Sequence, residues 1–137
     1  MGSHAVCCEN FPPVPNRPFL AAFADAADGI AHAVVHQPNF CIQLVIAAFA
    51  IIGAAVLHFD THTWLLVIIM IAFVLAAELF NTCLEHVVDL IQPETHPLAR
   101  SAKHAGAAAV LVASIAAAIV GAVVYGQALA HLFRQSG

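Results

Sequence analysis

The fold is decided by residues 64–89, which read WLLVIIMIAFVLAAELFNTCLEHVVD. An uncharged apolar run, residues 64–77, opens this stretch, and four polar residues then follow at intervals of 3, 4 and 4: Glu78, Asn81, Glu85 and Asp89. On a helix of about 3.6 residues per turn, these intervals put all four side chains on one stripe. Ionisable groups in an apolar helix are costly and usually face a bundle interior or a water-filled cavity. We call these four residues the polar stripe and expect the function to lie there.

The composition is that of a membrane protein. Of the 137 residues, 62% are hydrophobic and only 9% are charged, and the mean hydropathy is +0.91. Three segments are predicted to span a bilayer, at about residues 40–57, 64–90 and 105–127. A span needs about 20 apolar residues, so the middle one reaches that length only if its helix continues through Glu85 and Asp89.

The N-terminal region is predicted to lie outside the bilayer. Residues 1–18 contain four prolines and are expected to form a flexible tail. Residues 19–36 place apolar side chains near one helical face, which is typical of a helix lying on a membrane surface. The sequence therefore predicts an all-α membrane protein, with one membrane domain at 19–137 made of a surface helix and three spans.

The basic residues set the expected orientation, because Lys and Arg are retained on the cytoplasmic side. Arg17, Arg100 and Lys103 agree on a cytoplasmic N-terminus and a cytoplasmic loop at 91–104, whereas Arg134 disagrees. We therefore expect a multi-pass protein of the inner (cytoplasmic) membrane with the inner end of the polar stripe facing the cytoplasm. Its net charge of −4 gives no indication of a nucleic-acid partner.

The third predicted span carries small residues at every fourth position: Ala109, Ala113, Ala117 and Gly121. This spacing lets helix backbones approach closely in lipid, within one chain or between chains. Three spans alone would leave the polar stripe facing lipid, so we expect a homo-oligomer. The other interpretation is that these alanines serve only membrane insertion.

The residues themselves leave three interpretations of the polar stripe open. It could be a network that fixes helix packing, a pathway for ions or protons, or a metal-assisted catalytic site. Carboxylate oxygens suit a hard cation such as Mg²⁺, and the following loop supplies Glu94, His96, Arg100 and Lys103. Phosphoryl transfer needs three parts: a carboxylate to take a proton, a metal to bridge phosphates and a cation to neutralise charge.

Two motifs carry a resemblance to a known family. The first is ELFNTCLEHVVD at 78–89, and the second is ETHPLARSAKHAGAAAVL at 94–111. Together they resemble the signature of the prokaryotic diacylglycerol kinases, small integral-membrane lipid kinases that include undecaprenol kinases. The resemblance covers about residues 19–130 and is most specific in the two motifs.

The resemblance implies a homotrimer in which ATP and Mg²⁺ serve to phosphorylate the hydroxyl of diacylglycerol or undecaprenol at the cytoplasmic membrane surface. Glu78 matches the general base, and Glu85 matches a ligand of Mg²⁺. Lys103 matches the lysine that contacts the ATP phosphates. The remaining matches are to polar residues that shape the site or lie near the nucleotide: Asn81, Asp89, Glu94 and His96.

The chain also departs from the family pattern. Gln37 stands where the family usually has a second metal-binding glutamate, and His104 stands where an aspartate helps to hold the nucleotide. The basic and aromatic residues expected in the surface helix are replaced by Asp25, Ala27 and Asp28. Losing a negative charge beside Mg²⁺ weakens metal binding, so an impaired kinase is expected. The alternative is a non-catalytic membrane scaffold or a protein that only binds lipid or nucleotide.

Overall fold

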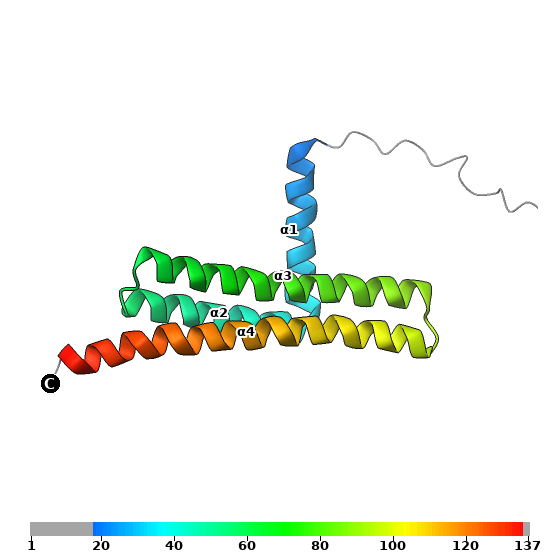
Figure 1. Ribbon diagram of the computed structural model, residues 1–137. Coiled ribbons are helices and arrows are strands. Elements are labelled where there is room, and N and C mark those ends of the chain that lie inside the picture. Colours follow the sequence, from blue (N-terminus) through cyan, green and yellow to red (C-terminus); the bar gives the residue numbers. More distant parts are fainter. Residues whose placement is uncertain (1–17, 136–137) are drawn as a thin grey trace, which may run out of the picture.

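The computed structural model describes residues 18–135, which form four helices (Figure 1). They are α1 (Phe19–His36), α2 (Pro38–Val56), α3 (Thr61–Ile91) and α4 (Pro97–Gln135). No strand occurs among the described residues, so the predicted all-α class is confirmed. Apart from Pro18, the tail predicted at 1–18 lies outside the described residues.

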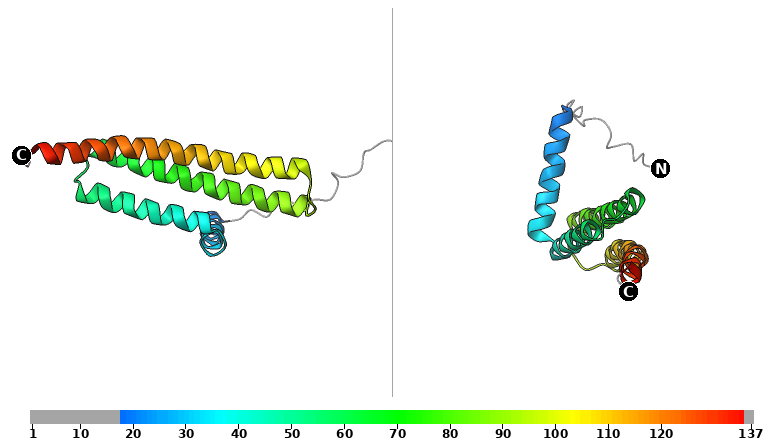
Figure 2. Two further views of the ribbon diagram at one scale, coloured as in Figure 1. Left: turned by 90° about the horizontal axis from the view of Figure 1, so that it is seen from below. Right: turned by 90° about the vertical axis from the view of Figure 1, so that its left-hand side faces the viewer.

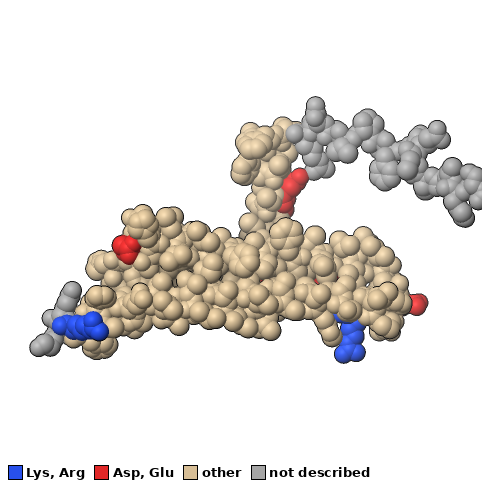
Figure 3. Space-filling model, in the orientation of Figure 1, with Lys and Arg blue, Asp and Glu red and all other residues tan. Residues whose placement is uncertain are grey.

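Three of these helices are long and apolar enough to cross a membrane, as the sequence predicts: α2, α3 and α4. They run side by side, and the views in Figures 1 and 2 agree that α3 and α4 form a long hairpin. On the face in Figure 3, most acidic and basic side chains lie near the two ends of the bundle or on α1. With 31 residues, α3 is about 46 Å long, well beyond the ~30 Å of a hydrocarbon core.

Helix α1 does not run along the three spans but projects sideways from them, as Figures 1 and 2 both show. The change of direction occurs at Gln37, whose extended backbone (φ −116°, ψ 97°) ends α1 and begins α2. Proline at position 38 then supplies the fixed φ that suits a first helical residue. Such a helix would lie along the surface of a membrane that the other three cross.

One prediction about the site region, the length of the loop between the second and third spans, is wrong. We expected a loop over 91–104, but the connection is only the short segment 92–96, because α4 already begins at Pro97. Proline is favoured at the first turn of a helix, and the following residues are good helix formers. Arg100, Lys103 and His104 therefore project from the first turns of α4 and not from a loop.

Two sets of hydrogen bonds stabilise the opposite end of the bundle: a helix cap and a bond between helices. The Asp60 carboxylate caps α3 by accepting hydrogen bonds from the backbone N–H groups of His62 (2.8 Å) and Thr63 (3.3 Å). The Thr63 hydroxyl also donates to it, and this bond holds the pKa of the Asp60 carboxyl below its usual value. Nearby, the Tyr125 hydroxyl donates to the backbone carbonyl of Ala50 at 2.5 Å, which ties α4 to α2.

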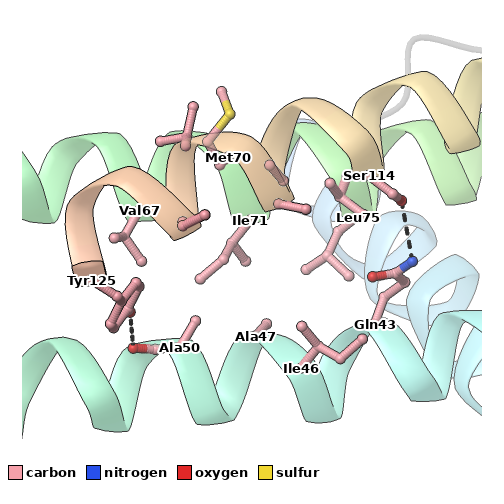
Figure 4. Close-up of a pocket in the computed structure, with 16 residues that line it drawn as sticks. Gln43, Ile46, Ala47, Ala50, Val67, Met70, Ile71, Leu75, Ser114 and Tyr125 are labelled. Carbon is pink, nitrogen blue, oxygen red and sulfur yellow. Dashed lines mark hydrogen bonds between the residues drawn. The ribbon is translucent and has the colours of Figure 1, made fainter.

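The small residues of α4 leave space inside the bundle. Ala113 is buried, while Ala117 and Gly121 line a cavity of about 430 Å³ between α2, α3 and α4 (Figure 4). Most of its other lining residues are aliphatic, including Ala47 and Val67. The repeat at every fourth position thus lies partly against the other two spans of the same chain.

Candidate functional site

The polar stripe lies on the C-terminal half of α3, toward the 92–96 turn. Glu78 is its most buried member, with only 5% of its surface exposed, and Thr82 one turn further is also buried. The carboxyl of Glu78 lies beside the amide of Gln43 on α2. A carboxylate in this position is shielded from water but has a polar neighbour from a second helix.

Asn81 and Glu85, one turn apart on α3, are joined directly. The Asn81 amide Nδ2 donates to Oε1 of Glu85 at 3.0 Å. The other end of that amide, Oδ1, is buried without a hydrogen-bond partner among the described residues and lies against Gly106 of α4. A Cβ at position 106 would overlap this oxygen, so Gly106 makes the room in which the Asn81 amide packs.

Asp89 and Lys103 form an ion pair between α3 and α4, with Nζ of Lys103 2.5 Å from Oδ1 of Asp89. Their side chains are 60% and 34% exposed, respectively. Exposed pairs of this kind contribute at most about 1 kcal/mol to stability. The pair therefore costs little to separate, and the lysine is available to another anion.

A second cavity of about 650 Å³ lies at this end of the bundle, around the 92–96 turn. It brings together the predicted nucleotide-contacting residues: Asp89, Glu94, His96, Lys103 and His104. His96 has a structural task as well, because its Nδ1 accepts the backbone N–H of Leu98 in the first turn of α4. We call this space the terminal cavity.

The residues predicted to bind Mg²⁺ come from two elements. Glu85 is half-buried in α3, and Gln37 is half-buried at the corner between α1 and α2. No group of three or more His, Cys, Asp or Glu residues is placed to hold a metal within 18–135. Mg²⁺ needs only one or two protein carboxylates when phosphates and water complete its shell, so the oxygen of Glu85 fits such a role.

Sequence reasoning missed Gln43 and Ser114. Gln43 Nε2 donates to Ser114 Oγ at 3.4 Å, which links α2 to α4 (Figure 4). The available signal was an amide within the uncharged segment 40–57, since polar side chains at that depth normally bond to a neighbouring helix.

Comparison with known proteins identifies the family. Residues 24–125 match the family described as prokaryotic diacylglycerol kinase, which is most of the chain. The chain belongs to the prokaryotic diacylglycerol kinase family. As a member of a kinase family it is a kinase-type phosphotransferase, and this confirms the resemblance seen in the two motifs.

Named relatives agree with this assignment. The chain is 32% identical over 107 residues to the undecaprenol kinase of Bacillus subtilis, covering 78% of this chain and 87% of the relative. It is 39% identical over 103 residues to a diacylglycerol kinase of Synechocystis, covering 74% and 59%. It is 36% identical over 91 residues to the diacylglycerol kinase of Escherichia coli K12, covering 66% and 75%. Membership in a kinase family implies ATP as the phosphate donor.

Proposed function

We propose that this protein is an ATP- and Mg²⁺-dependent lipid kinase that phosphorylates the hydroxyl of diacylglycerol or undecaprenol at the cytoplasmic surface of the inner membrane. The observation that carries the proposal is the buried Glu78 carboxylate on the same helix as the exposed Asp89, which pairs with Lys103 of α4. This helix leads from an apolar environment to an exposed one. A lipid hydroxyl and a water-soluble nucleotide approach from those two environments.

Glu78 acts as the general base. Its carboxylate takes the proton of the lipid hydroxyl as that oxygen bonds to the γ-phosphorus of ATP, and the bond from this phosphorus to the bridging oxygen breaks to release ADP. Asn81 supports the site through its hydrogen bond to Glu85. Burial of Glu78 keeps water away, which would otherwise compete with the lipid hydroxyl as acceptor.

Lys103 holds the phosphates of ATP. Its pairing with the exposed Asp89 is weak enough for a triphosphate, which carries more negative charge, to replace the aspartate. Glu94, His96 and His104 line the terminal cavity around the nucleotide. Glu85 and Gln37 would hold Mg²⁺, which would supply positive charge to neutralise the phosphates.

The assembly we propose is a homotrimer, as the family resemblance implies. Many large apolar side chains of α2, α3 and α4 are exposed in the single chain, including Phe49, Phe73 and Ile119. In a membrane these face lipid or a second copy. Light scattering of the detergent-solubilised protein, with the detergent mass subtracted, distinguishes three chains from one.

The deciding experiment is a kinase assay of purified protein with Mg²⁺ and ATP on a panel containing diacylglycerol and undecaprenol. We expect phosphorylation of one lipid, and a higher rate at low Mg²⁺ in the Gln37→Glu variant, since a carboxylate binds the cation more strongly than an amide does. If neither protein phosphorylates either lipid while both bind ATP, the chain is a nucleotide-binding protein and not an active lipid kinase.

A further inference from the structure

Arg100 is a basic residue beside the 92–96 turn that the proposed mechanism does not use. It lies in the first turn of α4, and its side chain is exposed. It lines the terminal cavity together with Lys103. Because the two residues are three positions apart on one helix, their side chains are neighbours on the same face. Figure 3 shows basic side chains at this end of the bundle.

The two basic side chains of the terminal cavity differ in what they contact. Lys103 forms an ion pair with Asp89, whereas Arg100 forms no ion pair with any carboxylate within residues 18–135. Glu94 lines the same cavity but is not joined to the guanidinium. An arginine carries five N–H donors in a planar fork, which binds phosphate oxygens two at a time. Arg100 is therefore a phosphate-binding group that does not first have to leave a carboxylate.

The packing of α4 against α3 places Arg100 further from the proposed base than Lys103. Gly106 lies against Asn81, one turn beyond that base. Lys103 reaches Asp89, about two turns further along α3. Since α3 and α4 form an antiparallel hairpin, the path from Gly106 back to Arg100 leads away from the base and toward the turn between the helices (Figure 1).

We propose that Arg100 is a further nucleotide-binding residue, whose guanidinium binds oxygens of the α- and β-phosphates of ATP while Lys103 lies nearer the γ-phosphate. The proposal rests on the lipid kinase function proposed above, in which the γ-phosphate is transferred beside the base and the other two phosphates extend away from it. These two phosphates remain in ADP, so Arg100 binds substrate and product alike. Such a contact lowers KM without changing kcat.

The first test measures binding without turnover, by equilibrium dialysis of ATP and ADP with Mg²⁺ in maltoside micelles, which contain no phosphate. Arg100→Met should weaken ATP and ADP binding equally, each about tenfold, because a charge-assisted hydrogen bond is lost. Arg100→Lys keeps the charge but not the fork, so it should lose less. Lys103→Met should weaken ATP binding more than ADP binding.

The chain supplies a matched control in Arg134, a basic residue at the opposite end of the same helix. Arg134→Met removes the same charge from α4 outside the terminal cavity, so its affinity for both nucleotides should equal that of wild type. Steady-state kinetics then adds a second readout. Arg100→Met should raise KM for ATP and the inhibition constant of ADP by the same factor, with kcat within about twofold of wild type.

Three results would overturn the proposal or part it from the kinase function. Equal nucleotide affinities in Arg100→Met and wild type would refute it, as would weaker binding of ATP alone, which would place the guanidinium at the γ-phosphate. If Arg100 binds a lipid headgroup instead, the variant would bind ATP normally and retain less phosphatidylglycerol in native mass spectrometry. A wild type that binds nucleotide but phosphorylates neither lipid would refute the kinase function, while dialysis would still decide the role of Arg100.

Discussion

Replacing Glu78 by glutamine separates the proposed base from every other part of the site. The amide keeps the shape and volume of the carboxyl in a position that is only 5% exposed, so the helix packing should persist. It cannot accept the proton of the lipid hydroxyl. General-base catalysis contributes about 10²- to 10⁴-fold, so kcat should fall by that factor, or about 3–5 kcal/mol in the barrier.

The Glu78→Gln variant should lose activity without losing stability. An ionised carboxylate buried at membrane depth is costly, and a neutral amide removes that cost while keeping a group that can bond Gln43. We expect the thermal unfolding midpoint in detergent to stay equal or to rise. ATP binding, measured by equilibrium dialysis with Mg²⁺, should remain within about twofold of wild type, because Glu78 lies away from the terminal cavity.

The matched variant is Glu85→Gln, seven residues further along the polar stripe. Its amide oxygen can still accept the Asn81 hydrogen bond, which measures 3.0 Å in the wild type, so the local geometry should be kept. If Glu85 binds the metal, the half-saturating Mg²⁺ concentration should rise about tenfold or more, and excess Mg²⁺ should restore much of the rate. Excess Mg²⁺ should not rescue Glu78→Gln. Retention of more than a tenth of wild-type kcat in Glu78→Gln would refute its role as base.

Three further predictions concern other parts of the molecule. Lys103→Met should raise KM for ATP at least about tenfold and destabilise the fold by less than about 1 kcal/mol, since the pair with Asp89 is exposed; an unchanged KM would exclude a phosphate contact. Tyr125→Phe should lower stability by about 0.5–1.5 kcal/mol in reversible unfolding, because the Ala50 carbonyl loses its side-chain donor, and no change would mean that the bond contributes nothing. The pKa of the Asp60 carboxyl is lowered, so the stability that this cap gives to α3 should be complete above about pH 4 and be lost as the pH falls further. The Asp60→Asn variant, whose side chain caps the helix without titrating, should lack this acid-dependent loss of stability in a thermal melt.

Much of the fold follows from local patterns in the sequence. The apolar segments predict the three spans because a bilayer requires long uncharged helices, and Pro38 marks the corner because proline favours a first helical turn. The start of α4 was placed too late because the polar residues near Arg100 resemble a loop in composition. Their helical state depends on Pro97 and on the alanines that follow, which are weaker signals than hydropathy.

Within the site, the sequence predicts the contacts that form inside a single helix. Spacing alone puts Glu78, Asn81 and Glu85 on one face, and the Asn81–Glu85 bond is the one-turn contact which that spacing allows. Contacts between helices are different, because they depend on rotation and register that no local pattern encodes. The approach of Gln43 to Glu78 and the packing of Asn81 against Gly106 belong to this second kind.

Exposure along α3 rises in the order that the proposed reaction requires. Glu78 is buried, Glu85 is half-buried, and Asp89 is 60% exposed beside Lys103. A lipid hydroxyl cannot leave the membrane surface without exposing its hydrocarbon chain, and a triphosphate cannot enter the apolar layer without losing its hydration. With polar groups graded from buried to exposed, α3 holds the proposed proton acceptor at the depth of the lipid and places Asp89, with its partner Lys103 of α4, at the depth of the nucleotide. The length of α3 beyond the ~30 Å needed to cross the bilayer has a function on this view, because the additional turns carry the polar stripe across the membrane–water boundary.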